Sequence, residues 1–266
     1  MRYGMEDVLP KGVVADFLRQ LSRTPRSALL LDYDGTLAPF QTERNRAFPY
    51  SGIIPLLENI IRSGRTRVVI ISGRPVREIQ TLLDPLTNLE IWGAHGMEHV
   101  LADGTYRQAT IDSDIAAALE DARKWAVAME LASLLEIKPG GVAIHWRGMP
   151  QSEIERIQAL APKGWTSLAK KAHLRFLNFD GGVELRAVRP NKGDAVTAVL
   201  NDSDRNTQVA FLGDDLTDED GFVALEGHGL SVLVREEYRN TKANAWLRPP
   251  HELIAFLKQW LDSVSA

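Results

Sequence analysis

The stretch ALLLDYDGT at residues 28–36 decides the fold class. Its first four residues are apolar, and two aspartates, Asp32 and Asp34, follow them one residue apart. A short apolar run that ends in a turn is typical of a strand buried on both faces of a parallel sheet. Ligands of open α/β sheets bind at the carboxyl ends of such strands. The two carboxylates therefore mark a candidate site at that edge of a sheet.

Similar strands alternate with helices near both ends of the chain. The apolar patterns predict strands at 67–71, 90–92, 209–212 and 231–234, and helices at 53–62, 76–83, 192–200 and 251–264. Strand–helix alternation of this kind predicts an α/β fold, with an open parallel sheet and helices on both of its faces.

The middle of the chain has a different pattern. Helical spacing of apolar residues at 115–129 is followed by strand-like stretches at 142–147, 174–179 and 183–188. Between them, a capping box at 152–155 predicts a helix that ends near Pro162 and Gly164. We therefore expect a small α+β domain at residues 111–188, inserted in an α/β domain built from residues 1–110 and 189–266.

Composition bounds the class of protein. The chain of 266 residues has a formal net charge of −4 and no cysteine. The mild charge predicts no basic face for nucleic acid, and the missing cysteines exclude disulfides and favour a reducing compartment. The N-terminal segment lacks the apolar centre of a signal peptide, and no apolar stretch is long enough to span a bilayer. We expect a soluble, cytoplasmic protein without nucleic-acid or membrane partners.

Two clusters of carboxylates follow expected strands. In residues 32–36, Gly35 permits close backbone approach and Thr36 supplies a hydroxyl, although a solvated Asp-Gly turn is the alternative. Residues 214–220 hold five carboxylates in seven positions, which is costly without a cation. Oxygen ligands of this kind suit Mg²⁺. An acidic helix start is the alternative, which we favour for Glu219 and Asp220 but not for Asp214 at the strand end.

Two further polar residues lie where an expected strand ends or a helix begins. Ser72 lies between a strand and a helix, where a hydroxyl and free N–H groups can hold a phosphate, or where a serine can cap the helix. Lys192 lies at the expected start of a helix, and a single lysine is most often a solvated surface charge.

Taken together, the aspartate pair, the serine, the lysine and the acidic cluster resemble the four motifs of the haloacid dehalogenase (HAD) superfamily. The resemblance implies a HAD-like, Rossmann-like core with an inserted cap that selects the substrate. It implies that Asp32 attacks phosphorus and that Asp34 is the general acid and base. It also implies that Asp32, the backbone carbonyl of Asp34 and Asp214 hold Mg²⁺. The remaining implied roles are phosphate binding by Ser72 and Lys192 and support of the metal ligands by Asp215 and Asp218.

Several local sequences are similar to those of trehalose-phosphate phosphatases. These are residues 72–74, 93–98, 145–147, 183–186 and 212–219 with the following Phe222, and Ala94 is a departure from a position that is commonly asparagine in that family. The resemblance implies that the cap residues Glu136, Lys138 and Glu184 bind sugar hydroxyls, and that the substrate-binding residues of the core are Thr36, Arg74 and His95. A solvated helix end remains the alternative for Glu136 and Lys138. His95 and His145 are each either ligand contacts or structural histidines.

The sequence therefore predicts a Mg²⁺-dependent phosphomonoester hydrolase that converts trehalose 6-phosphate to trehalose and phosphate in trehalose biosynthesis. A separate trehalose-phosphate synthase is an expected partner. The alternatives are a phosphatase of glucosylglycerol, sucrose or mannosylglycerate phosphate, a phosphosugar mutase, and a sugar-phosphate sensor without activity.

Overall fold

The computed structural model describes residues 12–179 and 181–265. Residues 1–11, part of the segment in which we expect no signal peptide, lie outside this description. The chain divides into two compact units, a core unit of Met1–Arg107 with Asn191–Ala266 and a cap unit of Gln108–Pro190. Among the residues of known placement, no helix is long and apolar enough to cross a membrane.

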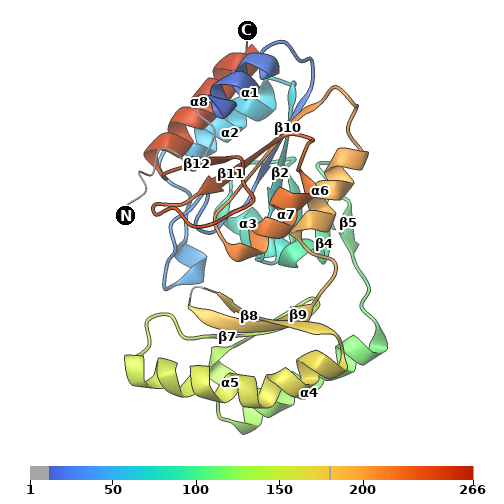
Figure 1. Cartoon of the computed structure of the whole chain (residues 1–266), viewed down its shortest axis with the longest axis vertical. Helices are drawn as coiled ribbons and strands as arrows, with labels where there is room; N and C mark the ends of the chain where they lie inside the picture. The colour runs from blue at the N-terminus through green and yellow to red at the C-terminus, as the bar shows by residue number, and fades with distance from the viewer. Residues whose placement is uncertain (1–11, 180, 266) are drawn as a thin grey trace. The chain divides into compact units, whose positions relative to one another are not determined.

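The core unit is built on one large sheet with the strand order β12-β11-β10-β1-β2-β3-β4-β5 (Figure 1). The strands are β1 (Ser27–Leu31), β2 (Thr66–Ile71), β3 (Glu90–Gly93), β4 (Glu98–Val100), β5 (Tyr106–Gln108), β10 (Gln208–Gly213), β11 (Leu230–Val234) and β12 (Ala245–Leu247). From β12 to β3 each neighbouring pair is parallel, and β4 is antiparallel to β3. The predicted open α/β sheet is confirmed.

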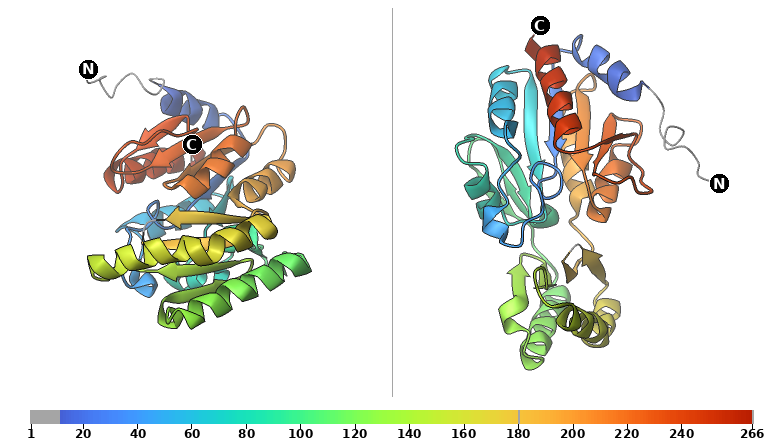
Figure 2. Two further views of the ribbon diagram at one scale, coloured as in Figure 1. Left: turned by 60° about the horizontal axis from the view of Figure 1, so that its bottom comes forward. Right: turned by 90° about the vertical axis from the view of Figure 1, so that its left-hand side faces the viewer.

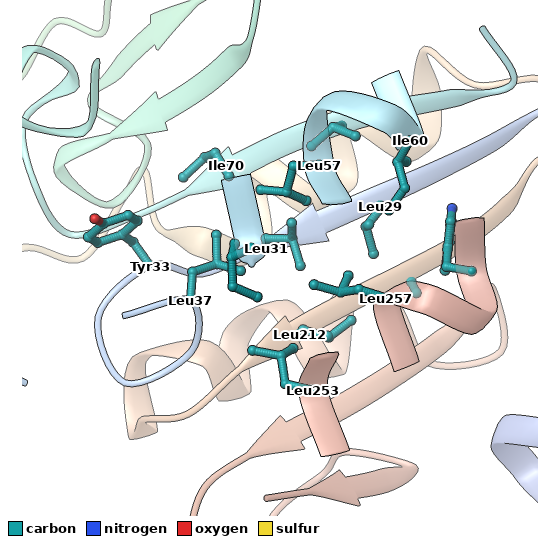
Figure 3. Close-up of a cluster of buried hydrophobic side chains, with 14 of the residues drawn as sticks. Leu29, Leu31, Tyr33, Leu37, Leu57, Ile60, Ile70, Leu212, Leu253 and Leu257 are labelled. Carbon is teal, nitrogen blue, oxygen red and sulfur yellow. The ribbon is translucent and has the colours of Figure 1, made fainter. Parts of the chain in front are cut away.

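Helices cover both faces of this sheet (Figure 2). They are α1 (Val13–Leu21), α2 (Ile53–Arg62), α3 (Val76–Leu82), α6 (Lys192–Asn201), α7 (Glu219–Ala224) and α8 (His251–Ser265), with the short 3-10 turns η2 (Arg44–Arg46), η3 (Ala94–Gly96) and η5 (Leu216–Asp218). Because successive side chains of a strand point to opposite faces, Leu29 and Leu31 pack with α1, α2, α3 and α8, while Ala28 and Leu30 pack with α6 and α7. Figure 3 shows the first of these two cores.

The cap unit is a four-stranded sheet with two long helices on one face (Figure 1). Its strands, β6 (Leu135–Lys138), β7 (Gly141–His145), β8 (Leu174–Phe179) and β9 (Gly182–Ala187), pair antiparallel in the order β6-β7-β9-β8. Its helices are α4 (Ser113–Ala128) and α5 (Gln151–Lys171), and η4 (Ala132–Leu134) precedes β6. Val142, Ile144, Val183 and Leu185 pack with the helices, so the polar residues between them lie on the opposite face.

The predicted end of α5 is wrong. The helix continues through Pro162 and Gly164 to Lys171, and its N-cap is Pro150 without a side-chain cap. Pro162 is exposed, whereas Ile157, Ala161, Trp165 and Ala169 form a buried stripe at intervals of four residues. A Cβ at position 164 would lie 2.0 Å from the Trp125 ring, so this glycine permits close packing of α5 on α4. The packing of the buried stripe outweighs the backbone hydrogen bond that proline removes.

Candidate active site

Three of the predicted motifs leave the sheet side by side. Strand β1 lies between β10 and β2 and runs parallel to both. Its carboxyl end carries Asp32, that of β2 carries Ser72, and that of β10 carries Asp214. All three side chains are buried. The carboxyl edge of the sheet therefore brings together residues that are up to 182 positions apart in the chain.

Lys192 joins the acidic residues from the first position of α6. Its ammonium nitrogen lies 2.6 Å from Asp32 Oδ1 and 2.6 Å from Asp218 Oδ1. Side-chain exposure is 3% for the lysine, 5% for Asp32 and 0% for Asp218, so the alternative of a solvated surface lysine is wrong. Asn191 is the N-cap of α6, and its side-chain oxygen accepts a hydrogen bond from the Asp194 N–H. This bond fixes the start of the helix and hence the direction of the lysine.

The carboxylates repel one another in this buried position. Burial raises the pKa of Asp32 to about 7, and the Asp218 charge adds to the increase although Lys192 opposes it. Burial, followed by the charges of Asp32 and Asp218, holds the pKa of Asp214 well above its ordinary value. Carboxylate oxygens of Asp32, Asp214 and Asp218 lie within 4.8 Å of one another. A hard divalent cation that prefers oxygen ligands fits this donor set, because it would offset the repulsion.

The acidic loop is ordered by Asp218. Its Oδ2 accepts the backbone N–H groups of Asp214 at 3.0 Å and Asp215 at 2.9 Å, while Oδ1 accepts from Lys192. The Asp215 carboxylate caps η5 and accepts the Leu216 N–H at 2.7 Å. Asp218 thus contacts both the lysine and the backbone of the acidic loop.

Gly35 lies directly against Asp214. Its φ is +80°, and a Cβ built on it would lie 2.2 Å from Asp214 Oδ2. Thr36, the next residue, is fully buried and donates its hydroxyl to Asp32 Oδ2 at 3.1 Å. The alternative of a solvated surface turn is therefore wrong, because Gly35 packs against Asp214 and Thr36 is buried. The glycine permits this close contact between the aspartate pair and the acidic cluster.

Asp34 points to Arg74 of the second motif. The guanidinium donates to both carboxylate oxygens, at 2.6 and 2.7 Å, and is 5% exposed. It also donates to the Arg44 carbonyl at 2.8 Å and to Glu78 at 3.1 Å. Arg74, predicted from the resemblance to bind substrate, contacts in this structure the residue predicted as the general acid. Sequence reasoning did not single out the carboxylate Glu78, and Arg74 lies before the N-cap of α3, so no helical spacing predicts their contact.

Ser72 and His95 lie on two loops that pack against each other. The Ser72 hydroxyl accepts the Arg74 N–H at 3.1 Å, and the Ser72 carbonyl accepts the His95 N–H at 2.9 Å. Helix α3 begins at Val76 with Pro75 as its N-cap, so the alternative of Ser72 as that cap is wrong. A Cβ at Gly73 would lie 2.6 Å from His95 Nε2, so the buried histidine packs against the serine loop.

The polar face of the cap sheet carries a second charged cluster. Lys138 Nζ lies 3.5 Å from Glu136 Oε2 and 3.2 Å from Glu184 Oε1, and His145 Nε2 lies 2.6 Å from Glu136 Oε2. Glu136 and Glu184 are register partners of the same residue, Ala143. Glu136 and Lys138 lie on strand β6, so the alternative of a helix end is wrong. The sheet brings together the three predicted cap residues and His145.

Known proteins place this fold in a class. Residues of this chain match the C-terminal domain of Candida albicans trehalose-6-phosphate phosphatase with a TM-score of 0.82 at 20% identity, covering 96% of this chain and 98% of that one. A Bacteroides thetaiotaomicron protein from a study of HAD-superfamily phosphatases matches with a TM-score of 0.57 at 17% identity, covering 96% and 98%. The core unit and its candidate site define a HAD-like fold.

The sequence comparison gives the family. The trehalose-phosphatase family model matches residues 30–249, and the chain belongs to that family. Trehalose-phosphate phosphatases of Mycobacterium ulcerans and Mycobacterium tuberculosis are 28% and 29% identical to it, over 87% and 91% of the chain. The chain spans 61% of the length of each of these relatives. The predicted family is confirmed.

Proposed function

We propose that this chain is a Mg²⁺-dependent phosphatase that hydrolyses trehalose 6-phosphate to trehalose and phosphate. The observation that carries the proposal is the buried Asp32 carboxylate at the end of β1, which pairs with Lys192 at 2.6 Å and lies beside Asp214. Buried ionisable groups that perturb one another at a sheet edge are typical of catalytic sites. Membership of the trehalose-phosphatase family supports the choice of substrate.

Asp32 is the proposed nucleophile. One carboxylate oxygen attacks phosphorus, the bond from phosphorus to the sugar oxygen breaks, and Asp34 gives its proton to the departing alcohol. Asp34 then takes a proton from water, whose oxygen attacks phosphorus and releases phosphate from Asp32. Lys192 and the Ser72 hydroxyl bind phosphoryl oxygens in this scheme. The present Lys192 contact with Asp32 supports that role, because it places a positive charge beside the attacking atom.

The residues that would hold Mg²⁺ are Asp32, Asp214 and the backbone carbonyl of Asp34. The ion would supply charge stabilisation for the phosphoryl group. Arg74 orients the Asp34 side chain, because two of its N–H groups donate to the two carboxylate oxygens. When Asp34 carries a proton, its hydroxyl oxygen is the weaker acceptor, so one of the two bonds from Arg74 is weakened while the other still holds the side chain.

The charged cluster of the cap is the proposed binding surface for the sugar. Glu136, Lys138 and Glu184 offer carboxylates and an ammonium group, which suit a disaccharide with many hydroxyls and little apolar area. A separate trehalose-phosphate synthase would supply the substrate of this reaction. The chain has no cysteine, which suits a reducing compartment, and we place the reaction in the cytoplasm.

Replacing Asp32 tests the chemistry. Asp32→Asn removes the nucleophile but keeps the shape of the side chain, so phosphate release with Mg²⁺ should fall by several orders of magnitude. Asp204→Asn is the control, because Asp204 is an exposed carboxylate that pairs with the exposed Arg26 of the same unit. Sustained turnover by the Asp32→Asn protein would contradict the nucleophile assignment.

Replacing Glu184 tests the sugar-binding surface separately. Glu184→Gln should raise the KM for trehalose 6-phosphate by about tenfold, the effect expected for one lost charged hydrogen bond of about 1.4 kcal/mol. Hydrolysis of p-nitrophenyl phosphate, which has no sugar, should keep its rate. An equal loss with both substrates would show that Glu184 supports the fold rather than binds sugar.

A further inference from the structure

The loop between β11 and β12, residues 235–244, lies beside the acidic loop. Strands β11 and β10 are parallel neighbours, with Gly213 opposite Leu233. Their carboxyl ends therefore lie at the same edge of the sheet, and the segments that leave them adjoin. Arg239, which no sequence motif singled out, lies in the segment after β11 and contacts the segment after β10.

Arg239 contacts the backbone of the acidic loop through two of its nitrogens. Nη2 donates to the Asp215 carbonyl at 2.7 Å, and Nε donates to the Asp214 carbonyl at 3.3 Å. Nη1 donates to the Asn240 carbonyl at 3.0 Å and to Glu219 Oε1. The arginine side chain is only 18% exposed, so these bonds are largely shielded from water.

Glu219 anchors the arginine and its loop at the start of α7. Besides Arg239, it accepts the Thr241 hydroxyl at 2.8 Å and the Lys242 N–H at 2.8 Å. A guanidinium beside a carboxylate keeps both charges compensated in this half-buried position. From the sequence, Glu219 was explained only as an acidic residue favoured at the start of a helix. In the structure it also joins the start of α7 to the loop of residues 235–244.

The two carbonyls that Arg239 holds belong to the same residues whose N–H groups Asp218 holds. Asp218 Oδ2 accepts the N–H groups of Asp214 and Asp215, and Arg239 occupies their carbonyls. The backbone at the end of β10 is fixed from both sides. Without such support, the repulsion of Asp214 by its neighbours would favour movement of the loop away from the cluster.

We propose that Arg239, held by Glu219, is a positioning residue for the candidate divalent-cation site: it holds the Asp214–Asp215 backbone so that the Asp214 carboxylate is preset for the ion. This inference rests on the proposed function, since it requires that Asp214 binds Mg²⁺. Outer contacts that orient metal ligands contribute strongly to affinity, and their loss costs about 10–100-fold in metal binding.

Calorimetric titration of the substrate-free protein with Mg²⁺ tests this role. Arg239→Met should raise the dissociation constant for Mg²⁺ by about 10–100-fold. Arg239→Lys keeps the charge, but one ammonium group cannot replace the planar fork that spans two carbonyls, so an intermediate loss is expected. Arg26→Met, which removes an exposed arginine of the core unit, should leave Mg²⁺ binding unchanged.

A double variant and the rate of phosphate release distinguish a loss of positioning from a general loss of structure. Because Glu219 acts through Arg239, the Glu219→Gln/Arg239→Met protein should bind Mg²⁺ as weakly as Arg239→Met alone. The Mg²⁺ concentration for half-maximal phosphate release should rise in Arg239→Met, while kcat at saturating Mg²⁺ should stay near that of the native protein. Melting in EDTA identifies a variant that fails to fold, in which case Arg239→Lys and Glu219→Gln carry the test.

The outcomes distinguish this inference from the proposed function. If folded Arg239→Met and Arg239→Lys proteins bind Mg²⁺ as tightly as the native protein, the positioning role is overturned and the metal site stands. If the native protein itself binds no Mg²⁺, the proposed metal site is overturned and the positioning role with it.

Discussion

At the scale of single residues, Gly35 sets how closely the first motif approaches Asp214. A methyl group at this position would lie 2.2 Å from Asp214 Oδ2, well inside contact distance, and the carboxylate would have to move. The positive φ of 80° adds a backbone cost for any side chain. The glycine is thus a condition for the arrangement of the acidic residues.

Gly35→Ala should abolish Mg²⁺ binding and phosphate release, because the displaced Asp214 carboxylate can no longer share an ion with Asp32. Gly104→Ala is a matched control in the same unit. Its φ is +86°, and its Cβ would meet nothing within 4 Å, so it carries the same backbone strain without the collision. Calorimetric titration with Mg²⁺ measures both variants. Native-like binding by Gly35→Ala would show that the loop yields without cost.

The sequence predicted which residues meet at the core site better than it predicted their contacts. Asp32, Lys192 and Asp214 each follow a strand or begin a helix, and the sheet order brings such positions together. The Arg74 contact with Asp34 and the Arg239 contacts with the acidic loop depend on side-chain direction across loops. No periodicity encodes that direction, so the contacts of these two arginines could not be predicted from the sequence.

At the scale of elements, α4 ends in an arrangement that suits glycine, although the residue there is Glu130. The Leu131 N–H bonds the Ala126 carbonyl at 2.9 Å, and the Glu130 N–H bonds the Val127 carbonyl at 3.0 Å. These are the bonds of a Schellman motif, in which the residue after the C-cap has a left-handed conformation. Glu130 has a φ of +62° and is exposed.

Glu130→Gly should therefore increase the free energy of unfolding by about 1 kcal/mol, the order of the left-handed strain that it relieves. Lys124→Gly, at an exposed position inside the same helix, should decrease it by about 1 kcal/mol. Urea unfolding followed by circular dichroism measures both. A decrease with Glu130→Gly would mean that the glutamate side chain contributes more than its backbone costs.

The first residue of the inner strand β3 is a buried carboxylate outside the candidate site. Glu90 accepts two hydrogen bonds from Arg67, at 2.7 and 3.0 Å, one from the Trp92 indole at 3.2 Å, and shares one with His99 at 2.9 Å. Burial alone would raise its pKa, but the bonds from His99 and Arg67 lower it below the ordinary value of 4.5. A carboxyl with a depressed pKa stabilises the fold above pH 4.5, and this contribution is lost as the pH falls through the folded-state pKa.

Glu90→Gln should reduce the free energy of unfolding at neutral pH by about 2–3 kcal/mol, because it leaves Arg67 without its buried partner. The difference in the free energy of unfolding between the variant and the native protein should shrink at low pH, where Glu90 is protonated in both the folded and the unfolded state. Glu120→Gln, which breaks a solvent-exposed pair with Arg123, should change little. Urea unfolding at a series of pH values gives the comparison. A difference independent of pH would exclude the carboxylate charge as its cause.

Element types were well predicted where the apolar pattern had one clear period. Strands β1 and β2 and helix α2 follow from runs or stripes of apolar residues that end at a turn or glycine. The end of α5 was not predicted, because Pro162 and Gly164 act as helix breakers only where packing does not outweigh them. Gly164 is tolerated because it permits close packing on Trp125, nearly forty positions away in the sequence, and no local pattern reports this contact.

At the scale of the whole molecule, two units have separate hydrophobic cores. The core unit packs its sheet between two groups of helices, and the cap unit packs its sheet under α4 and α5. The residues proposed to hold Mg²⁺ all lie in the core unit. An ion that binds only the folded core stabilises that unit by mass action.

Mg²⁺ should therefore slow amide hydrogen exchange in the core unit, with the largest effect at residues 27–36 and 208–218, and leave residues 113–171 of the cap less affected. At a concentration of about 100 times the dissociation constant, the stabilisation is about 2.7 kcal/mol. Asp214→Asn should abolish the response. Equal protection of both units in the native protein, or protection that persists in Asp214→Asn, would contradict a metal site confined to the core.

The claim of a trehalose 6-phosphate phosphatase is tested most directly by kcat/KM for phosphate release with Mg²⁺. The substrates to compare are trehalose 6-phosphate, glucose 6-phosphate, sucrose 6-phosphate and glucosylglycerol phosphate. We expect a clear preference for trehalose 6-phosphate and loss of all phosphate release with EDTA. A preference for another of these sugar phosphates, or release that persists without a divalent ion, would contradict it.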